Sequence, residues 1–599
     1  MLKKLKDGLR LRRGLKLVWA GSRKWVFLSL ILTVAIGVLP VGSLYLQKLF
    51  FDAFADGMVD GTGIAAKTLI VLVLAMAGIE IVIAGFRSLA AYVTTAQGQT
   101  LQDYVMQRLH KKSIELDLSF YETPSYFDSL HIAQTEAPKR TAAFVDVLAA
   151  IAREGLSLVS VLALLMTYHW GIALLLLVAV APGFLVQVKS SNKLFQWQKE
   201  ASGREREANY YHDLLTQAVA AKESRVFGFG PVISEWYVVL RTRLREELLR
   251  IAHWKQTRSF FVTVGATLAL FGGFFLFAKA TSQGVFTLGD MALFYAGFNR
   301  AQGHLRALVA GVSGLYESNL FLGKLFEVLE SKSKIVSPKS PIGFDENASP
   351  EIALKNVSFK YPGTTRQALS DVSLTITPGE HVAIVGKNGS GKSTFVKLLC
   401  RLYDRTEGEV TINGIDVREV DLAKYRSRFS VLFQDYLQFG LSAQKNIWLG
   451  DVSRDLEDGE AIAEAARLSG AAGVIDRLPE GYETVLGKVI KEGEQLSQGE
   501  WQKLALARAL YTNAKVTILD EPTSWMDPES EQEFFDQFHR LSTGRTAIMI
   551  SHRLSTVKMV DRIVVMERGQ ILEIGKHDEL MAKKGRYFEL YELQAKDYR

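Results

Sequence analysis

The first half of the chain contains apolar stretches long enough to cross a membrane, and these stretches most constrain its fold. A helix rises about 1.5 Å per residue, so about 20 apolar residues cross the hydrocarbon core of a bilayer. Six such stretches occur before about residue 320, which predicts an α-helical, six-span transmembrane domain. The predicted spans are Trp25–Leu46, Thr68–Tyr92, Ala149–Thr167, Gly171–Val188, Ser259–Ala280 and Met291–Leu315.

The distribution of charge also favours a membrane protein. The net charge of +7 would suit a nucleic-acid-binding protein, but the basic residues crowd the N-terminus ahead of the first span. Membrane proteins keep such basic segments in the cytoplasm. We therefore expect a cytoplasmic N-terminus and no nucleic acid partner. The N-terminal bases are Lys3, Lys4, Lys6, Arg10, Arg12, Arg13, Lys16, Arg23 and Lys24.

The segments between the spans differ in length and charge. The loop after the first span carries Asp52, Asp56 and Asp60 without a basic residue, so we expect it outside the cell. Residues 93–143 and 189–258 are long and polar with helical periodicity, which predicts spans that continue into the cytoplasm and turn back. The breaks "YETPSYFDSL" and "FGFGPVISEW" suit short transverse helices; simple surface loops are the alternative.

The sixth span is unusually polar. It carries Asn299, Arg300, His304 and Arg306 among apolar residues. One arginine at the centre of a membrane helix costs ~2.5–3.5 kcal/mol, so these side chains should face protein or water. They predict a hydrated pathway with a basic wall that contacts cargo. The alternative is structural pairing, for instance with Glu80 of the second span.

A change of composition marks the domain boundary. Residues 331–350 form a polar linker rich in proline and serine. Residues 1–330 are predicted to be the transmembrane domain, which opens with a basic elbow segment, and residues 351–599 to be a soluble α/β domain. Its expected strands lie near 352–361, 382–386, 516–520 and 546–551.

The stretch "VAIVGKNGSGKSTF" predicts a nucleotide site. A short apolar strand precedes the glycines and a helical pattern follows them, and the pattern Gly386-x-x-x-x-Gly391-Lys392-Ser393 matches the P-loop. Backbone N–H groups of such a loop wrap phosphates, while Lys392 reaches the β- and γ-phosphates and Ser393 holds Mg²⁺. A glycine turn in an unrelated fold would not explain the flanking strand and helix. The nucleotide-binding residues are predicted to be Gly386, Asn388, Gly389, Ser390, Gly391, Lys392, Ser393 and Thr394.

A second acidic motif completes a hydrolytic site. In "KVTILDEPTSWMD" an apolar strand ends at Asp520, followed by Glu521. Asp520 at the strand end can hold the Mg²⁺ shell, and Glu521 can orient or deprotonate the water that attacks the γ-phosphate.

Further motifs resemble one family. The stretch "EQLSQGEWQKLALARAL" holds "LSQGE" where the ATP-binding cassette (ABC) transporters have their LSGGQ signature. Together with Gln434 in "VLFQD", Asp527 in "SWMD" and His552 in "ISHRLS", it makes the chain similar to that family. Six spans followed by a cassette resemble the half-transporter arrangement of type IV exporters.

The resemblance implies roles for individual residues. Tyr361 would stack on adenine, unless it is only a strand aromatic. Gln434 would sense and bind Mg²⁺ and touch the transmembrane half, and Glu521 would be the general base. The remaining implied contacts are His552 with the γ-phosphate, Asp527 with the nucleotide, and Ser497 and Gly499 with the nucleotide of a second subunit.

Three positions depart from the family pattern. Gln498 replaces a glycine of the signature, Glu500 replaces its glutamine, and Trp525-Met526 replace a small-then-apolar pair. A carboxylate at 500 is electrostatically unfavourable near a polyphosphate unless it points away. Glu521 and His552 are present, however, so we expect two competent sites in a homodimer, with a heterodimer as the alternative.

The resemblance is strongest to the lantibiotic-type peptide exporters, through "WQK" after the signature and "FQWQKEASGRERE" after the fourth span. It implies ATP-driven export of a modified peptide, or of other amphipathic cargo, across the bacterial inner membrane, with the cassette in the cytoplasm. A lipid or drug exporter of the same architecture is the first alternative. A regulated channel or an ATPase without transport is the alternative from another class.

Overall fold

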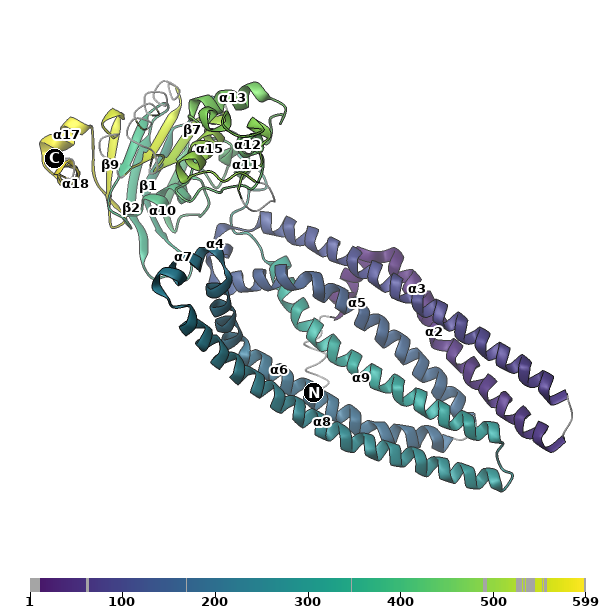
Figure 1. Cartoon of the computed structure of the whole chain (residues 1–599). Helices are drawn as coiled ribbons and strands as arrows, with labels where there is room; N and C mark the ends of the chain where they lie inside the picture. The colour runs from purple at the N-terminus through teal and green to yellow at the C-terminus, as the bar shows by residue number, and fades with distance from the viewer. Residues whose placement is uncertain are drawn as a thin grey trace. The chain divides into compact units, whose positions relative to one another are not determined.

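The computed structural model describes residues 11–60, 64–167, 170–345, 347–487, 493–523, 531, 534, 544–551, 553 and 557–596 (Figure 1). The chain divides into two compact units. The first, the helical unit, comprises Met1–Ile114 and Asp128–Ser331. The second, the cassette, comprises Glu115–Phe127 and Lys332–Arg599.

Very long helices make up the helical unit. They have between 43 and 53 residues, or about 65–80 Å, which is roughly twice the thickness of a bilayer core. The prediction that the spans continue as helices beyond the membrane is therefore confirmed. The long helices are α2 (Leu11–Asp60), α3 (Ile64–Glu115), α5 (Pro124–Met166), α6 (Trp170–Thr216), α8 (Gly230–Ser282) and α9 (Leu288–Glu330).

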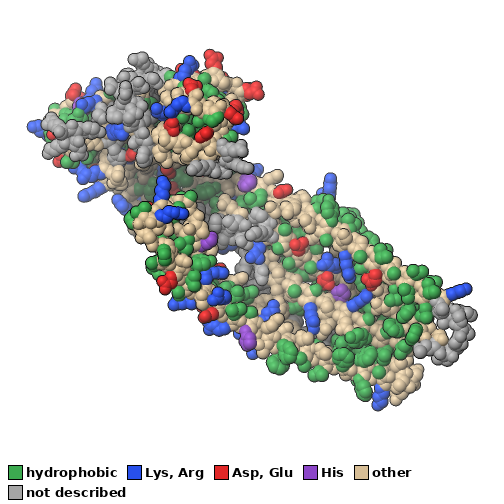
Figure 2. All heavy atoms as spheres, viewed as in Figure 1, with side chains coloured by type: hydrophobic (Ala, Val, Ile, Leu, Met, Phe, Trp, Pro, Cys, Tyr) green, Lys and Arg blue, Asp and Glu red, His purple; other side chains and the backbone are tan. Residues whose placement is uncertain are grey.

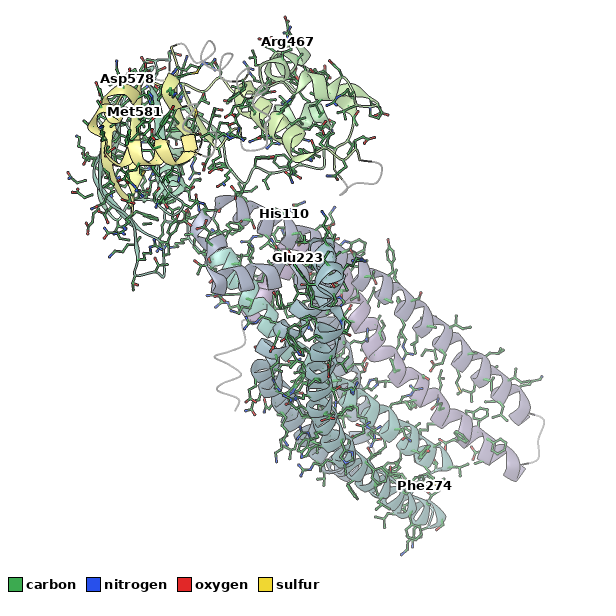
Figure 3. The ribbon with its side chains drawn as sticks, turned by 60° about the vertical axis from the view of Figure 1, so that its left-hand side comes forward. His110, Glu223, Phe274, Arg467, Asp578 and Met581 are labelled. Carbon is green, nitrogen blue, oxygen red and sulfur yellow. The ribbon has the colours of Figure 1, made fainter. Side chains whose placement is uncertain are left out.

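Five predicted spans lie within these helices, and the third, Ala149–Thr167, extends one residue beyond the end of α5 at Met166. Among the described residues, four segments are long and apolar enough to cross a membrane by length and composition. These are Arg12–Gly57, Lys67–Glu115, Arg140–Met166 and Gly230–Ser282. Figure 2 shows one face of the helical unit, on which apolar side chains surround a smaller number of acidic, basic and histidine side chains. Figure 3 marks the unit's two ends, with Phe274 near one and His110 and Glu223 towards the other.

Aromatic packing and a helix cap join the ends of the helices. The rings of Phe277 on α8 and Phe294 on α9 are stacked with their centroids 5.0 Å apart. Helix α9 begins with a capping box, in which the Thr287 side chain accepts from the N–H of Asp290 and the Asp290 carboxylate accepts from the N–H of Thr287. The same carboxylate lies 2.9 Å from the amine of Lys48 on α2. Pairing of this kind makes two charges tolerable near the membrane level.

Two short helices interrupt the cytoplasmic connections. They are α4 (Leu118–Glu122) and α7 (Ala218–Phe227), so the alternative of simple surface loops is wrong. Both helices lie mostly before the predicted breaks, because the chain turns near the start of each break and most of the break belongs to the long helix that follows. Gly228 ends α7 in a left-handed conformation, with φ of 67°. Thr123 separates α4 from α5 in an extended conformation.

Two sheets form the framework of the cassette. An antiparallel sheet has the order β2-β1-β4-β5, and a six-stranded sheet has the order β10-β9-β3-β8-β7-β6. The strands are β1 (Ile352–Lys360), β2 (Gln367–Ile376), β3 (His381–Val385), β4 (Glu407–Ile412), β5 (Ile415–Asp416), β6 (Phe429–Leu432), β7 (Val516–Asp520), β8 (Thr546–Ile550), β9 (Arg562–Glu567) and β10 (Gln570–Gly575). The four strands predicted from the sequence correspond to β1, β3, β7 and β8.

Helices accompany both sheets. The longer ones are α10 (Lys392–Leu399) after the P-loop, α13 (Gly459–Leu468), α15 (Gln498–Tyr511) after the signature and α18 (Arg586–Lys596). The shorter ones are α11 (Leu422–Arg426), α12 (Ala443–Trp448), α14 (Ala472–Ile475), α17 (His577–Lys583), η1 (Gly481–Glu483) and η2 (Val557–Met559). In Figure 3, Arg467 on α13 and Asp578 on α17 mark opposite sides of the cassette.

The sheet order brings two motifs together. Strands β3, β8 and β7 are parallel neighbours, and every residue in them is buried. Such continuous apolar runs are typical of parallel strands covered on both faces. Because parallel strands end at the same edge, the loop after β3 and the acidic pair after β7 lie side by side, where α/β sheets bind their ligands.

Candidate nucleotide site

The loop between β3 and α10 has a conformation that requires glycine. Gly386 has φ of 156°, and a Cβ there would lie 2.2 Å from the carbonyl oxygen of Met566. Gly391 has φ of 109°, and a Cβ there would lie 2.8 Å from a methyl group of Leu369. The chain therefore turns tightly against β2 and β9, and its amides are free of side-chain cover.

Two polar side chains of the loop are buried. The amine of Lys392 donates to the carbonyl oxygens of Gly386 and Lys387, at 2.9 and 3.2 Å. Burial lowers the pKa of Lys392, against the opposing charges of Glu521 and Asp520. The hydroxyl of Ser390 is buried without a hydrogen-bond partner among the described residues. An unpartnered buried hydroxyl beside a cation and bare amides fits the oxygens of a phosphate.

Asp520 and Glu521 end strand β7. Burial, together with the charge of Glu521, raises the pKa of Asp520 to about 6, although Lys392 opposes this shift. The hydroxyl of Ser393 donates a hydrogen bond to the same carboxylate. Mg²⁺ prefers oxygen ligands and needs few from the protein when phosphates supply others, so this pair fits the ion.

Glu521 has an unusual backbone. Its φ of 52° lies in the left-handed region, which is uncommon for a residue other than glycine and marks local strain. Its N–H donates to the carbonyl oxygen of Ile550, and its own carbonyl oxygen accepts from the amide of Gln502 at 3.1 Å. The side-chain amide of Gln434 donates to its carboxylate at 3.2 Å. These contacts hold the carboxylate beside Gln434, at the edge of the sheet where the loop lies.

Tyr361 lies just after β1. Its hydroxyl is 3.0 Å from the hydroxyl of Thr394 on α10, and its ring packs edge-on against Phe359 and Tyr403. The amine of Lys397 lies 5.5 Å from the ring centroid, within the range of a cation–π interaction. The ring is thus fixed beside the start of the P-loop helix.

One cavity of about 810 Å³ joins these groups, a volume within the range of ligand sites. The predicted residues that line it are Tyr361, Asn388, Gly389, Gly391, Lys392, Ser393, Thr394, Gln434, Asp520 and Glu521. Gly386 and Ser390 belong to the same loop. Arg366 and Arg568 also line the cavity but were not predicted to do so. They belong to no sequence motif, so only their positive charge could have suggested a contact with phosphates.

The other predicted residues are placed elsewhere. Ser497 and Gly499 begin α15 and do not line this cavity. His552 and Asp527 lie outside the described residues. The cavity of a single chain therefore contains only part of the predicted set.

The carboxylate of Glu500, which replaces the glutamine of the signature, is bound by neighbouring residues. Glu500 and Ser497 form a capping box, in which Glu500 accepts from the N–H and the hydroxyl of Ser497, both at 2.9 Å. The guanidinium of Arg477 lies 2.8 Å from the other carboxylate oxygen. The N–H of Ser497 contributes most to the lowered pKa of Glu500. Glu500 thus remains charged, but its charge is directed to the start of its own helix and to Arg477.

Gln498 is also held by its neighbours. Its carbonyl oxygen accepts from the hydroxyl of Tyr436 at 3.0 Å, and its side-chain oxygen accepts from Gln438 at 3.0 Å. A glycine at this position would lack the second bond. The substitution therefore anchors the signature to the segment that follows β6.

Three of the four polar residues predicted in the sixth span have partners within the helical unit. Arg300 lies 3.5 Å from the Glu80 carboxylate and donates to the carbonyl oxygen of Pro40 at 3.0 Å. His304 lies 2.7 Å from the carboxylate of Glu154. The structure thus contains the Arg300–Glu80 pair that the sequence analysis posed as the alternative. Asn299 donates to the carbonyl oxygen of Tyr295, and Arg306 lines a separate cavity.

Membrane-length helices joined to a P-loop cassette define a membrane transport ATPase. The family model described as ABC transporter matches residues 369–524. Over 574 residues the chain is 30% identical to the subtilin transport ATP-binding protein SpaT of Bacillus subtilis, covering 94% of this chain and 91% of that protein. The chain belongs to the ABC transporter family. It is an ATPase coupled to transport, and its nucleotide is ATP with Mg²⁺ as the partner ion.

The names of other similar proteins refer to different cargoes. The nisin transport ATP-binding protein NisT of Lactococcus lactis is 28% identical, covering 97% of this chain and 96% of that protein. An ATP-dependent lipid A-core flippase of Methylobacillus flagellatus is 30% identical, with coverage of 97% and 96%. A bacterial Atm1-family ABC exporter with ATP bound matches the fold with a TM-score of 0.83 at 23% identity, covering 96% of this chain and 99% of that one. The chain is therefore a type IV exporter in fold, a multi-pass bacterial membrane protein with a cytoplasmic cassette.

Proposed function

We propose that this chain is one half of a dimeric exporter that moves a modified peptide across the bacterial inner membrane by alternating access. The observation that carries the cargo class is the similarity to the subtilin and nisin transport proteins. It extends over 94% and 97% of the chain and so includes the helical unit, through which cargo would pass.

The nucleotide chemistry follows from the cavity. The P-loop amides and Lys392 bind the phosphates of ATP, and Tyr361 stacks on the adenine. Ser393, Asp520 and Gln434 hold Mg²⁺, which when bound supplies positive charge against the phosphate oxygens. The Lys392 amine donates to the Gly386 carbonyl oxygen at 2.9 Å. When ATP binds, we expect the amine to donate to a phosphate oxygen instead.

Glu521 acts as the general base of the hydrolytic step. Its strained backbone and the 3.2 Å bond from Gln434 hold the carboxylate at the cavity wall. There it orients the attacking water and accepts a proton from it. His552 contacts the γ-phosphate in this proposal, and Asp527 contributes to nucleotide binding.

A second chain completes the site. Ser497 and Gly499 do not line the cavity of their own chain, and we propose that they reach the nucleotide bound by a partner cassette. A homodimer is favoured, because Glu521 and the P-loop of this chain are intact; a heterodimer is the alternative. Shifting a two-state equilibrium from 1:99 to 99:1 takes about 5.5 kcal/mol of differential binding, which two ATP molecules at a subunit seam can supply.

Export of a lipid is the second candidate function. A flippase of lipid A-core is as similar to this chain, at 30%, as the subtilin transport protein is. The pairs Arg300–Glu80 and His304–Glu154 suit either cargo, because each basic side chain already lies beside a carboxylate of the same chain.

The two functions are separated by the ATPase activity of the full-length protein in nanodiscs. We expect amphipathic peptides to stimulate hydrolysis and lipid A to leave it unchanged. The Glu521→Gln variant serves as the control for coupled hydrolysis. Stimulation by lipid A alone would replace the peptide proposal with the flippase.

A further inference from the structure

The third basic side chain of the sixth span lacks the partners that the other two have. Arg300 is paired with Glu80 and His304 with Glu154. Arg306, half a helical turn further along α9, has no carboxylate partner among the described residues. Arg306 is exposed, and charged residues within membrane segments usually mark a ligand pathway. Its guanidinium is therefore open to a negative group of a ligand.

Arg306 lines a cavity of about 230 Å³ between helices α6, α8 and α9. Figure 1 shows these three helices in the helical unit. Lys255 of α8 is a second cation in its wall, and none of the described residues that line it is acidic. The polar lining residues that can donate hydrogen bonds are Gln187, Ser259, Thr263 and Gln302. Two cations with neutral donors form a site for an anion.

The remaining wall of the cavity is apolar. Val262 and Ala266 line it from α8, and Val309 and Ala310 line it from α9. The cavity holds about eight water volumes of ~30 Å³ each, which is less than a drug-sized ligand occupies. It can thus receive one acidic group and a few carbon atoms, but the rest of a larger molecule must lie outside it.

Neighbouring residues place the cavity at the cytoplasmic edge of the membrane level. Trp254 precedes the predicted fifth span by about one turn, and tryptophan is enriched at the membrane–water interface. The amine of Lys193 and the guanidinium of Arg258 lie 4.2 and 4.3 Å from its ring centroid. These cations add to the positive potential near the mouth, where a cargo from the cytoplasm arrives.

We propose that the Lys255–Arg306 cavity is a cargo subsite that binds an acidic group, a side-chain or terminal carboxylate, of the exported peptide. This inference rests on the proposed peptide export, and it adds the chemical group by which the peptide is recognised. The planar guanidinium of Arg306 can bind a carboxylate through two parallel hydrogen bonds, while Lys255 acts as a point charge. The apolar wall contacts the carbon atoms beside the acid.

The test uses two amphipathic peptides of about 20 residues that differ only by one glutamate or glutamine. The full-length protein is placed in nanodiscs of zwitterionic phosphatidylcholine, so that no anionic lipid competes. ATPase stimulation is measured against peptide concentration. We expect the acidic peptide to act at a roughly tenfold lower half-maximal concentration, equivalent to about 1.4 kcal/mol.

The variants Arg306→Gln and Lys255→Gln should each reduce this preference to about twofold or less, and Arg306→Lys should retain part of it. Lys279→Gln is the matched control. It removes the same charge from α8, but 24 residues or about 36 Å from Lys255 along the helix, and should keep the full preference.

Other outcomes overturn the inference in distinguishable ways. If both peptides stimulate the wild type at equal concentration, the peptide function stands and the acidic subsite does not. If Arg306→Gln raises the half-maximal concentration of both peptides by the same factor, Arg306 has only a structural role. If neither peptide acts, but added phosphatidylglycerol stimulates hydrolysis in an Arg306-dependent way, the cavity binds lipid phosphate and the peptide function fails with the inference.

Discussion

The amine of Lys397 lies 2.7 Å from a carboxylate oxygen of Glu122, and this ion pair joins the P-loop helix α10 to the short helix α4. The hydroxyl of Tyr403 donates to the other oxygen of the same carboxylate. Lys397 also lies within cation–π distance of Tyr361, at the nucleotide cavity. A single carboxylate of α4 therefore contacts two residues, Lys397 and Tyr403, that both pack against the predicted adenine-binding ring of Tyr361.

Replacing Glu122 with Gln should weaken the link between the cassette and cargo. The change removes a charged partner of Lys397 but keeps the shape of the side chain, so stability should fall by less than about 1 kcal/mol. We expect cargo-stimulated ATP hydrolysis to fall severalfold more than ATP affinity does. The measurement is the ATPase activity of the nanodisc-bound protein with and without stimulating cargo.

The matched control for that variant is Glu409→Gln. Glu409 pairs with Lys355 at 3.6 Å on the cassette surface, where both side chains are exposed. Its loss should leave stimulation unchanged. Equal behaviour of the two variants would show that the Glu122 contact carries no coupling.

Replacing Glu521 with Gln tests the general base. An amide keeps the hydrogen bonding around Gln434 but cannot accept the proton of the attacking water. Turnover should fall by at least about 100-fold while ATP binding persists. ATP binding is followed by a fluorescent analogue and turnover by phosphate release. Hydrolysis near the wild-type rate would assign the base to another residue.

The signature variant Glu500→Ala should destabilise the start of α15. It loses the cap to Ser497 and the Arg477 ion pair, and loss of a helix cap costs about 1 kcal/mol. Glu500→Gln should be milder, because glutamine also completes a capping box. We expect melting temperatures in the order wild type, Glu500→Gln, Glu500→Ala. The opposite order of the two variants would show that the side-chain cap at position 500 does not stabilise the start of α15.

Asp416 makes the cassette sensitive to acid. Burial alone would raise its pKa, but hydrogen bonds from Arg405 and Arg418 outweigh burial and lower the pKa to about 2. Since the pKa in the unfolded chain is about 3.9, its contribution is present above pH 4 and is lost as the pH falls towards 2. Asp416→Asn should therefore show a smaller drop in melting temperature between pH 5 and pH 3 than the wild type. An identical drop would show that other carboxylates dominate acid unfolding.

The sequence-based predictions were accurate where structure depends on residues close together in the chain, and less accurate where it depends on distant ones. The helices around the six spans and strands β1, β3, β7 and β8 were predicted because apolar length and periodicity are local properties. The short helices α4 and α7 were expected a few residues too late, since the glycine and proline that mark a turn do not show which side of it is helical. Arg366 and Arg568 belong to no motif, and only folding brings them to the cavity.

By itself, the sequence determined the architecture and the nucleotide. Apolar segments of membrane length predict spans, and the glycine spacing of a P-loop is dictated by the phosphates it surrounds. Only the tertiary structure decided which charges are neutralised. Arg300 and Arg306 look alike along the chain, yet one lies beside Glu80 and the other faces a cavity whose described lining residues include no carboxylate. Electrostatic pairing depends on distances of a few ångströms between segments far apart in sequence, and those distances are set when the helices pack.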